Sequence, residues 1–518
     1  MQAVVHVPAA RAVLVPPHIM LEGEKSALVK YKGEQYRAYD HVFSTAIRLR
    51  DRGLNVDSPM NHGDFEYTGR FQPFLHQKVT AAFLSMYHRA FCFNELGTGK
   101  TAACVWAAEY MRKLGLIRRV LVLCPITTMR DVWEAEIMNC ARGVPVEVLR
   151  GSVKARRAAA ANSDIPWLIL NHDGIKTDTG LYLLAQNDID LIICDEATAY
   201  KTPGADRTKS FIKLVQKDNR RLWALTGTPM AKLPTDVYTN AKLICPDKVP
   251  ASFSMFEDMT CFTIGLHKKV PKRNAVEQVL AVLEPAICYR KSECIDLPPL
   301  INVDREVELS PQQTRIIKEL TTKFVSEVAG KKITALAAQV QAIKVLQVLQ
   351  GGVITDSQSG AGEIIGAPGR LAVLRELIDA SNSKSVVFAP FKLSIRYLRE
   401  ALADYGVGVI DGTVPEIERS HILRRFASED SDMRVLLAHP KTTGHGLTLT
   451  AASTLVWYGP IFSPELYLQG CGRIDRPGQK HHMSVYNLHG HPNERQMYAG
   501  LQQRIDMQEL LLNAVKSF

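Results

Sequence analysis

A glycine-rich loop near residue 100 carries the clearest chemistry in the sequence. Residues 94–101 read N-E-L-G-T-G-K-T, between an apolar run and a helical stretch. Backbone N–H groups in such a loop, at a helix N-terminus, cradle phosphates; the lysine reaches the β and γ oxygens and the threonine hydroxyl holds Mg²⁺. A glycine turn that binds no nucleotide is the alternative. We predict a phosphate site, with Asn94 standing where the usual pattern begins with glycine, formed by Gly97, Thr98, Gly99, Lys100 and Thr101.

Two carboxylates follow a second apolar run. Asp195 and Glu196 come directly after residues 191–194. At a strand end one acid can hold Mg²⁺, and its neighbour can polarise the attacking water. An Asp-Glu pair after a strand is usually a surface turn, but its position about ninety residues after a phosphate loop favours catalysis. We predict that Asp195 binds magnesium and that Glu196 is a catalytic carboxylate.

Two arginines near the C-terminal end could act on the same phosphates. Arg473 and Arg476 are three residues apart, which places them on one face of a helix. A guanidinium from a facing lobe can neutralise the charge that develops on a transferred phosphoryl group. The alternative is a surface helix in which an arginine pairs with Asp475. We predict catalytic roles for both arginines.

Two short polar loops also follow apolar runs. Residues 226–229, T-G-T-P, suit a strand end packed against the catalytic acid, although alone they signal only a turn. A second loop is flanked by glycines and suits close approach of a nucleic-acid backbone. Its candidate contacts are Thr443, Gly444 and His445.

The elements that position these groups repeat one pattern. After roughly residue 90, short apolar runs, glycine- or proline-marked loops and helical stretches alternate, as expected of parallel strands joined by helices. Each polar motif follows an apolar run, which places it at the carboxyl edge of a sheet. The predicted strands form two series, 90–94, 120–124, 167–170, 191–194 and 222–225, then 385–388, 408–410, 435–437, 454–458 and 484–488. We predict an α/β protein with two similar lobes.

A chain of 518 residues exceeds one ordinary core and predicts several structural units. In the first seventy residues we expect strands at 12–16 and around 35–38 and a helix at 42–52. Apolar residues at helical spacing predict a helix that ends before the two glycines at 351–352. The tail from 493 to 515 is also a predicted helix. The predicted parts are an N-terminal accessory module (1–70), a first lobe (71–250), a helical connector or protrusion (251–365), a second lobe (366–492) and a C-terminal helix (493–518).

The net charge is +10, which favours a polyanionic partner. The alternative is a scatter of solvated charges, including the basic residues at 268–269 and 272–273. No run approaches the roughly 18 apolar residues of a membrane span, and the first residues lack a secretory signal, so we expect a cytoplasmic protein. The ten cysteines include no C-x-x-C pair, so we predict neither disulfides nor a zinc site.

Taken in order, these motifs resemble helicase superfamily two and, within it, the Swi/Snf-type DNA-dependent ATPases. The resemblance covers roughly residues 70 to 500. Residues 195–198 match the Asp-Glu-Ala-His position, and residues 473–479 resemble the Arg-x-x-Arg-x-Gly-Gln ending of that branch. The chain looks most similar to compact bacteriophage and bacterial members, which resemble annealing helicases. The resemblance implies two tandem RecA-like lobes, ATP and magnesium as cofactors, and DNA, duplex or branched, as partner.

The resemblance also suggests roles for residues whose spacing alone indicates none. Gln77 looks like the glutamine that recognises the adenine edge, and Gln469 belongs to the final motif, which faces the nucleotide. The residues that resemble DNA contacts are Pro125, Asn171, His172 and Lys201. The chain departs from the pattern at Thr198, Ala231 and Thr448, where members carry a histidine and two asparagines.

Our leading expectation is therefore an ATP-driven motor that moves along duplex or branched DNA. A helicase that separates strands shares the same motifs and remains the nearest alternative. A DNA-binding module with a weak ATPase is the alternative from another class, and a protein-remodelling ATPase is disfavoured by the nucleic-acid motifs. The sequence leaves the oligomeric state open between a monomer and an unknown oligomer.

Overall fold

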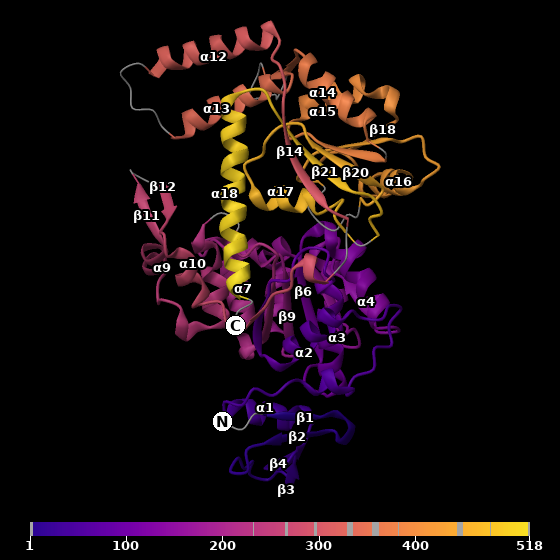
Figure 1. Ribbon diagram of the computed structural model, residues 1–518, viewed down its shortest axis with the longest axis vertical. Helices are drawn as coiled ribbons and strands as arrows, with labels where there is room; N and C mark the ends of the chain where they lie inside the picture. The colour runs from indigo at the N-terminus through magenta and orange to yellow at the C-terminus, as the bar shows by residue number, and fades with distance from the viewer. Residues whose placement is uncertain are drawn as a thin grey trace. The chain divides into compact units, whose positions relative to one another are not determined.

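The chain divides into two compact units, which we describe separately (Figure 1). Unit 1 comprises Met1–Cys294 with Leu510–Phe518, and unit 2 comprises Ile295–Glu509. The computed structural model describes residues 4–230, 233–264, 268–294, 298–328, 335–354, 362–381, 383–442, 449–476 and 478–515. In this described part, no helix is long and apolar enough to cross a membrane.

Unit 1 is built on a seven-stranded parallel sheet with the order β13-β5-β10-β9-β6-β8-β7. The central strands are continuous apolar runs, because parallel sheets are covered on both faces. The strands are β5 (Arg89–Cys92), β6 (Arg119–Cys124), β7 (Val146–Val148), β8 (Trp167–Asn171), β9 (Ile189–Asp195), β10 (Arg221–Leu225) and β13 (Ala286–Ile287). Its helices are α2 (Leu75–Met86), α3 (Lys100–Lys113), α4 (Ala135–Cys140), α5 (Val153–Ala160), α6 (Asp178–Ala185), α7 (Asp206–Gln216), α8 (Tyr238–Ile244), α9 (Phe253–Thr260), α10 (Ala275–Leu280) and α11 (Lys291–Cys294).

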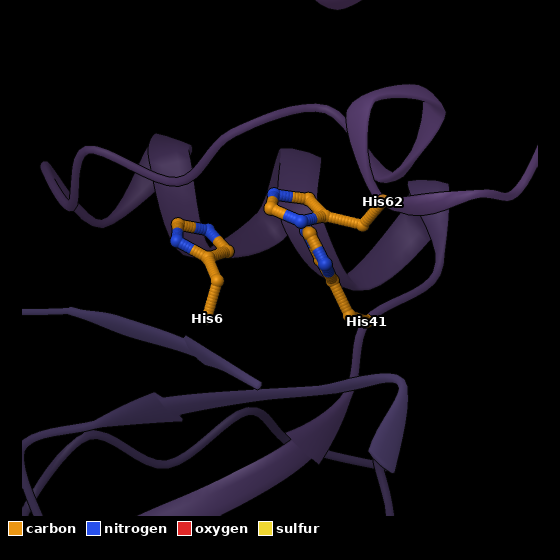
Figure 2. A group of neighbouring side chains, drawn as sticks. All are labelled: His6, His41 and His62. Atoms are coloured by element: carbon orange, nitrogen blue, oxygen red, sulfur yellow. The ribbon is translucent and has the colours of Figure 1, made fainter. Parts of the chain in front are cut away.

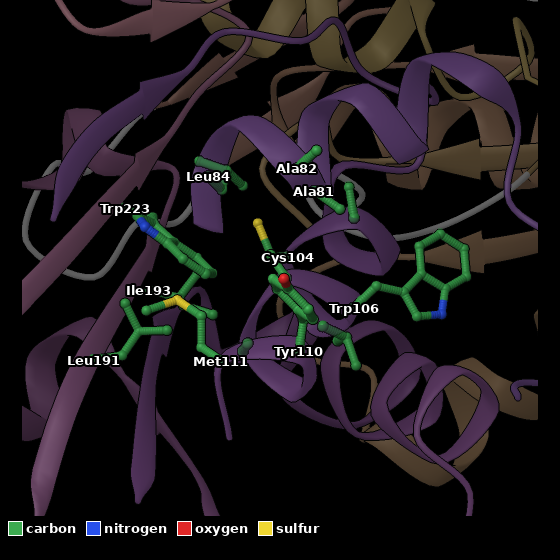
Figure 3. Close-up of a cluster of buried hydrophobic side chains, with 14 of the residues drawn as sticks. Ala81, Ala82, Leu84, Cys104, Trp106, Tyr110, Met111, Leu191, Ile193 and Trp223 are labelled. Atoms are coloured by element: carbon green, nitrogen blue, oxygen red, sulfur yellow. The ribbon is translucent and has the colours of Figure 1, made fainter. Parts of the chain in front are cut away.

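The core of unit 1 fixes the helix that begins at the phosphate loop. Figure 3 shows Cys104 and Met111 of α3 between side chains of α2 and of the sheet, including Ile193 and Trp223. These side chains are almost completely buried. Burying a side chain of this size contributes about 1.5–3 kcal/mol. The packing therefore holds the N-terminus of α3 at the carboxyl edge of the sheet.

The N-terminal segment forms a four-stranded antiparallel sheet with the order β1-β2-β4-β3. Its elements are β1 (Val5–Val7), β2 (Ala12–Val15), β3 (Ser26–Tyr31), β4 (Glu34–Asp40) and α1 (Phe43–Asp51). The predicted strands 12–16 and 35–38 and the helix 42–52 are confirmed. Val13, Tyr39 and Leu49 join the same buried cluster as α2 and α3. The small sheet and α1 therefore pack against α2 and α3.

The interval after residue 250 contains the expected helices and also strands that we did not predict. β11 (Cys261–Ile264) and β12 (Lys268–Pro271) form an antiparallel hairpin. β13 pairs with β5 at the edge of the sheet of unit 1. β14 (Leu300–Glu306) pairs with β21 (Met483–His489) in unit 2. The predicted division of the chain into five parts stays a prediction.

Unit 2 contains a second parallel sheet, with the order β14-β21-β20-β17-β19-β18. Its further strands are β17 (Lys384–Phe388), β18 (Val407–Ile410), β19 (Val435–Ala438) and β20 (Ala452–Trp457), beside the hairpin β15 (Gly352–Ile354) and β16 (Gly362–Ile364). Its helices are α12 (Pro311–Val328), α13 (Ala335–Leu349), α14 (Pro368–Asp379), α15 (Lys392–Ala401), α16 (Glu416–Ala427), α17 (Pro464–Cys471) and α18 (Pro492–Val515). The predicted two-lobed α/β fold is confirmed.

Neighbouring residues of the strands in unit 2 belong to two different cores. Val387 packs with α14 and α15 on one face, whereas Val386 and Phe388 pack with α16 and α17 on the other. Tyr498 and Leu501 of α18 join the second cluster. The C-terminal helix therefore packs on unit 2 through its first turns, and the predicted helix at 493–515 is confirmed.

A buried ion pair joins four elements of unit 2. Arg370 donates to Glu494 at 2.7 Å, and their side chains are 1% and 0% exposed. Arg370 also donates to the carbonyl oxygens of Tyr458 and Leu488, at 2.6 and 3.1 Å. Glu494 accepts from the Gly490 N–H at 2.8 Å. The pair thus ties α14 and α18 to the ends of β20 and β21.

We predict that Glu494→Gln destabilises unit 2 by about 3–5 kcal/mol, because it leaves the Arg370 charge buried without its partner. Hydrogen exchange of peptides from β20 and β21 measures the change. Glu306→Gln is the matched control, since it removes an exposed pair with Arg495 worth at most about 1 kcal/mol. Equal protection in the two variants would contradict a stabilising role for the buried pair.

Candidate nucleotide site

The predicted phosphate loop lies between β5 and the first residue of α3. Gly97 and Gly99 have φ angles of +87° and +80°. Residues other than glycine rarely adopt this backbone conformation. A Cβ atom on Gly99 would also lie 2.1 Å from Nε2 of Gln77. Glycine is therefore required at position 99 for its backbone angle and for the close approach of Gln77.

Lys100 lies across this loop. Its Nζ donates to the carbonyl oxygens of Asn94 and Glu95, at 2.6 and 3.3 Å. The hydroxyl of Thr98 donates to the same Glu95 oxygen at 2.8 Å. The ammonium group is thus held against the start of the phosphate loop by two of its carbonyl oxygens. A positive charge in this position fits the phosphate-binding role predicted for Lys100.

Asn94 and Glu95 anchor the loop to distant parts of unit 1. Asn94 donates from Nδ2 to the Thr80 hydroxyl at 2.8 Å and accepts at Oδ1 from the Tyr289 N–H at 3.0 Å. Glu95 donates its N–H to the Tyr289 carbonyl at 2.9 Å and accepts at Oε2 from the Lys291 N–H at 2.7 Å. Glycine at position 94 could not make the two side-chain bonds. Sequence reasoning missed this role, because the partners are 195 and 196 residues away.

Gln77 begins α2 and contacts the loop. Its Oε1 accepts from the Phe74 N–H at 3.0 Å, and its Nε2 donates to the Thr98 carbonyl at 3.2 Å. A ring nitrogen of His76 lies 2.8 Å from the same carbonyl. The structure therefore brings Gln77 to the phosphate loop. Its predicted recognition of adenine stays a prediction.

Asp195 ends β9 and is held by an indole. Nε1 of Trp133 donates to Oδ2 of Asp195 at 2.9 Å, and the Glu196 N–H donates to Oδ1 at 3.1 Å. Burial raises the pKa of Asp195, while Trp133 and the nearby charge of Lys100 act against that rise. Trp133 lies in a π-helical turn, η4 (Met129–Glu134), and is fully buried. Its side chain therefore positions the acid.

Glu196 adopts a left-handed backbone conformation, with φ +51° and ψ +57°. Such angles in a residue other than glycine cost about 1–3 kcal/mol and persist where the surroundings fix them. The turn that follows is held by Asn240, whose Nδ2 donates to the Ala197 carbonyl at 2.9 Å. The Thr226–Pro229 loop lies against the phosphate loop, since a Cβ on Gly227 would be 3.7 Å from the Leu96 nitrogen. The acid pair and both loops therefore meet at one edge of the sheet.

The predicted DNA contacts of unit 1 follow β6, β8 and β9. Nδ1 of His172 lies 3.0 Å from the Tyr200 hydroxyl, and Lys201 pairs with Asp236 at 3.5 Å. Pro125 follows β6, and Asn171 ends β8. These residues share the carboxyl edge of the sheet with the acid pair. Contact with DNA stays a prediction for each of them.

The basic hairpin at 268–273 is tied to acidic neighbours. Lys269 pairs with Glu257 at 2.7 Å and donates to the Thr263 hydroxyl at 2.9 Å. Lys272 donates to the carbonyl of Asp258. These contacts occupy two of the four basic residues that we considered for a polyanionic partner.

In unit 2, the prediction that Arg473 and Arg476 lie on one face of a helix is wrong. α17 ends at Cys471, and the arginines follow in turns after Gly470 and Gly472, residues that weaken a helix end. Arg473 is 1% exposed. Nε of Arg476 donates to the Gly472 carbonyl at 3.1 Å. Burial lowers the pKa of Arg476 to about 10, so it remains charged at neutral pH.

Gln469 lies on α17 and is 1% exposed, and its Nε2 donates to Oε1 of Glu465 at 3.5 Å. The end of the same motif is closed by Gln479, which donates to the carbonyl oxygens of Ala452 and Ile474, at 2.9 and 3.1 Å. Five residues named from the sequence lie outside the described residues. They are two departures from the family pattern, Ala231 and Thr448, and three candidate nucleic-acid contacts, Thr443, Gly444 and His445.

Comparison with known protein families agrees with this arrangement. The chain matches the SNF2-related domain over residues 76–353 and the helicase conserved C-terminal domain over residues 369–478. The first match alone spans more than half of the chain. The chain belongs to the SNF2-related family. The predicted resemblance is therefore confirmed.

Curated relatives of this SNF2-related chain are distant and mostly longer. ATP-dependent DNA helicase DDM1 of Arabidopsis thaliana is 23% identical over 429 residues, 76% of this chain and 55% of DDM1. Putative protein p41 of Acyrthosiphon pisum secondary endosymbiont phage 1 is 25% identical over 422 residues, 78% of this chain and 88% of p41. DNA annealing helicase and endonuclease ZRANB3 of Mus musculus is 24% identical over 420 residues, 77% of this chain and 37% of ZRANB3. The chain thus spans about half of DDM1 and most of p41.

Among solved structures, the chain is similar to the Sulfolobus solfataricus SWI2/SNF2 ATPase core in complex with dsDNA. The TM-score is 0.42 at 18% sequence identity, and the match covers 87% of this chain and 96% of that chain.

We predict that Trp133→Phe in this SNF2-related chain lowers ATP turnover at neutral pH about tenfold or more, because a hydrogen bond to a charged group is lost. Losing the indole donor raises the pKa of Asp195 further, so the acidic limb of the pH–rate profile moves to higher pH. The magnesium concentration for half-maximal turnover should also rise.

The matched control is Trp167→Phe, which removes an indole bond to Glu109 of 2.7 Å in neighbouring β8. It should leave the pH profile unchanged. A turnover defect in Trp133→Phe that is the same at every pH would indicate a structural loss and contradict the role given to the indole.

Proposed function

We propose that this chain is an ATP-dependent DNA translocase, a DNA-stimulated ATPase that converts hydrolysis into movement along duplex or branched DNA. One observation carries the proposal: Lys100, Asp195 and Glu196 converge at one sheet edge, around a loop whose backbone turns at Gly97 and Gly99. Phosphoryl transfer depends mainly on positioning and on neutralising charge. Family membership supports the assignment of these residues to ATP hydrolysis.

The residues at this edge divide the chemistry between them. Lys100 and the N–H groups of Gly97–Thr101 bind the β and γ phosphates. The hydroxyl of Thr101 and the carboxylate of Asp195 would hold a magnesium ion, which supplies charge neutralisation when bound. Glu196 orients the attacking water. Gln77, already hydrogen-bonded to the loop, would recognise the adenine edge.

DNA as partner is supported by several independent features. The chain carries a net charge of +10, and phosphate contacts supply most of the affinity of proteins that bind DNA without reading sequence. The names of DDM1 and ZRANB3 state that they act on DNA. The match along most of phage protein p41 supports the DNA of a phage-infected bacterial cell as substrate.

Strand separation is the second candidate, because DDM1 is named a helicase. ATP turnover measured without DNA and with single strands, duplex and forks distinguishes the candidates. A translocase is stimulated by duplex and displaces a third strand from a triplex without unwinding a fork. Fork unwinding would favour a helicase, and turnover unaffected by any DNA would overturn the proposal.

We predict that Lys100→Ala abolishes turnover and weakens ATP binding, because the lysine charge acts on the phosphates. Glu196→Gln should bind ATP and fail to hydrolyse it, since only the water-orienting carboxylate is lost. Fluorescent-ATP binding and phosphate release measure both effects. Lys113→Ala, at the exposed end of α3, is the control. Normal hydrolysis by a folded Lys100 variant would reject the site.

We further predict that Arg476→Ala keeps ATP and DNA affinity close to wild type while turnover falls by about 10³-fold, because an arginine finger acts in the transition state. Lys480→Ala, at an exposed ion pair just beyond, is the control. Arg473→Ala and the double variant follow, and near-equal defects would mean that both arginines act as one unit. Wild-type turnover in Arg476→Ala would reject the finger.

A further inference from the structure

Three histidines from separate segments meet in the N-terminal module (Figure 2). His6 lies on β1, His41 directly follows β4, and His62 ends the short helix η2 (Pro59–His62). One ring nitrogen from each lies within 4.8 Å of those of the other two. The ring centroids are 4.9 to 5.0 Å apart. Figure 2 shows the three rings gathered in one place.

Hydrogen bonds to Asp57 determine which nitrogens carry lone pairs. Nε2 of His41 lies 2.9 Å from the Asp57 carbonyl, which can only accept, so Nε2 carries the proton and Nδ1 the lone pair. The Asp57 N–H donates to Nε2 of His6 at 3.2 Å, so that nitrogen also holds a lone pair. Nε2 of His62 is buried and makes no hydrogen bond within the described part of the chain. Its nearest acidic atom is Oδ2 of Asp57 at 3.8 Å.

We propose that His6, His41 and His62 bind one divalent transition-metal ion, with zinc as the natural occupant. Three neutral imidazoles are a common protein ligand set for zinc, with a water or carboxylate in the fourth position. The Asp57 carboxylate is exposed and beside the cluster, so it is the available fourth ligand. Metal-binding histidines usually donate their second ring N–H to a carbonyl or carboxylate oxygen, which fixes the orientation of the ring. The hydrogen bond from His41 to the Asp57 carbonyl is a contact of this kind.

The spacing requires only a small closure. Zinc–nitrogen bonds of about 2.0–2.1 Å in a tetrahedral site separate ligand nitrogens by about 3.3 Å. The nitrogens lie within 4.8 Å of one another, so side-chain rotations would have to bring them together by up to about 1.5 Å. His6 and His62 are only partly buried, so their rings can make that movement. His6 would exchange its 3.2 Å bond to the Asp57 N–H for the metal.

A stack of neutral rings without metal is the competing explanation. Burial lowers the pKa of His6 and of His41, which favours neutral rings in either case. The stacked pair of His6 and His62, with an interplanar angle of 10°, suits that alternative. The buried Nε2 of His62 does not, because an unmatched buried polar atom is costly. A metal ion satisfies it.

The consequence of binding is local and structural. The ion would join β1 to the segment 57–62, which lies about fifty residues further along the sequence. That segment is fastened to α2 by Ser58, whose hydroxyl lies 3.1 Å from the hydroxyl of Ser85. α2 also carries Gln77 at its start. The site would therefore fix the accessory sheet onto the helix that borders the nucleotide site, and it would stabilise unit 1.

Our expectation of no zinc rested on cysteine spacing alone. All ten cysteines are free, and most are buried in strands or helices. The histidines stand 35 and 21 residues apart, a spacing typical of no metal motif. Only the fold brings them together.

The test uses the purified full-length protein and metal alone. Competition with a chromophoric chelator measures zinc affinity and stoichiometry, and cobalt reports the ligand type by its visible spectrum. We expect one equivalent of zinc, a tetrahedral cobalt spectrum and no thiolate-to-cobalt charge transfer. His6→Gln and His62→Gln should each weaken zinc binding at least about tenfold. His18→Gln, an exposed histidine of the same module, should bind like wild type.

A folding readout accompanies the affinity measurement. Saturating zinc should slow hydrogen exchange in β1 and in residues 57–62 of the wild type and leave His6→Gln unaffected, since a ligand stabilises only the state that binds it. Circular dichroism of the metal-free variants shows whether they are folded. Absence of stoichiometric zinc in the wild type, equal affinity in the folded variants, or a thiolate band with cobalt would each overturn the proposal. None of these readouts depends on ATP turnover.

Discussion

A partly buried carboxylate at the end of β9, that of Asp195, constrains the architecture of the nucleotide site. Removing the charge of Asp195 from water is costly, and burial raises the pKa of its carboxyl. Three groups act against that cost: the indole of Trp133, the N–H of Glu196 and the charge of Lys100. Each comes from a different element, so the strand order that places β9 between β6 and β10 is what assembles them. The site exists because the sheet brings these partners to one edge.

The same constraint explains the backbone around the acid pair. Glu196 is held in the left-handed region, which turns the chain immediately after the strand and points the next turn toward Asn240. The phosphate loop makes a comparable turn at Gly97 and Gly99. The strained backbone of Glu196 and the glycines at 97 and 99 have the same effect, because each turn brings polar groups to the end of a strand. Such strain persists only where surrounding contacts fix it.

The sequence predicted what is local and missed what is distant. The strands of both lobes, the phosphate loop and the acid pair each produce a pattern within a few neighbouring residues, and the structure places them as expected. The bonds from Trp133 to Asp195 and from Glu95 to Lys291 join residues 62 and 196 apart, and no spacing rule reveals them. β14 was missed because its exposed edge residues lack the apolar run of a central strand. The prediction of a helix across Arg473 was wrong, because it rested on a three-residue spacing and did not take account of Gly470 and Gly472, which weaken a helix.

The anchoring of the phosphate loop also connects the nucleotide site to the path of the chain. Asn94 and Glu95 bond to Tyr289 and Lys291, which lie a few residues before Cys294, where the first segment of unit 1 ends. Because the bonds include both backbone and side-chain groups, the loop cannot move away from this segment without leaving several polar groups unmatched, at about 1–3 kcal/mol each. The phosphate loop and the exit of unit 1 therefore behave as one hydrogen-bonded unit. A change in the position of the phosphate loop would therefore have to move Tyr289 and Lys291 with it or break these hydrogen bonds.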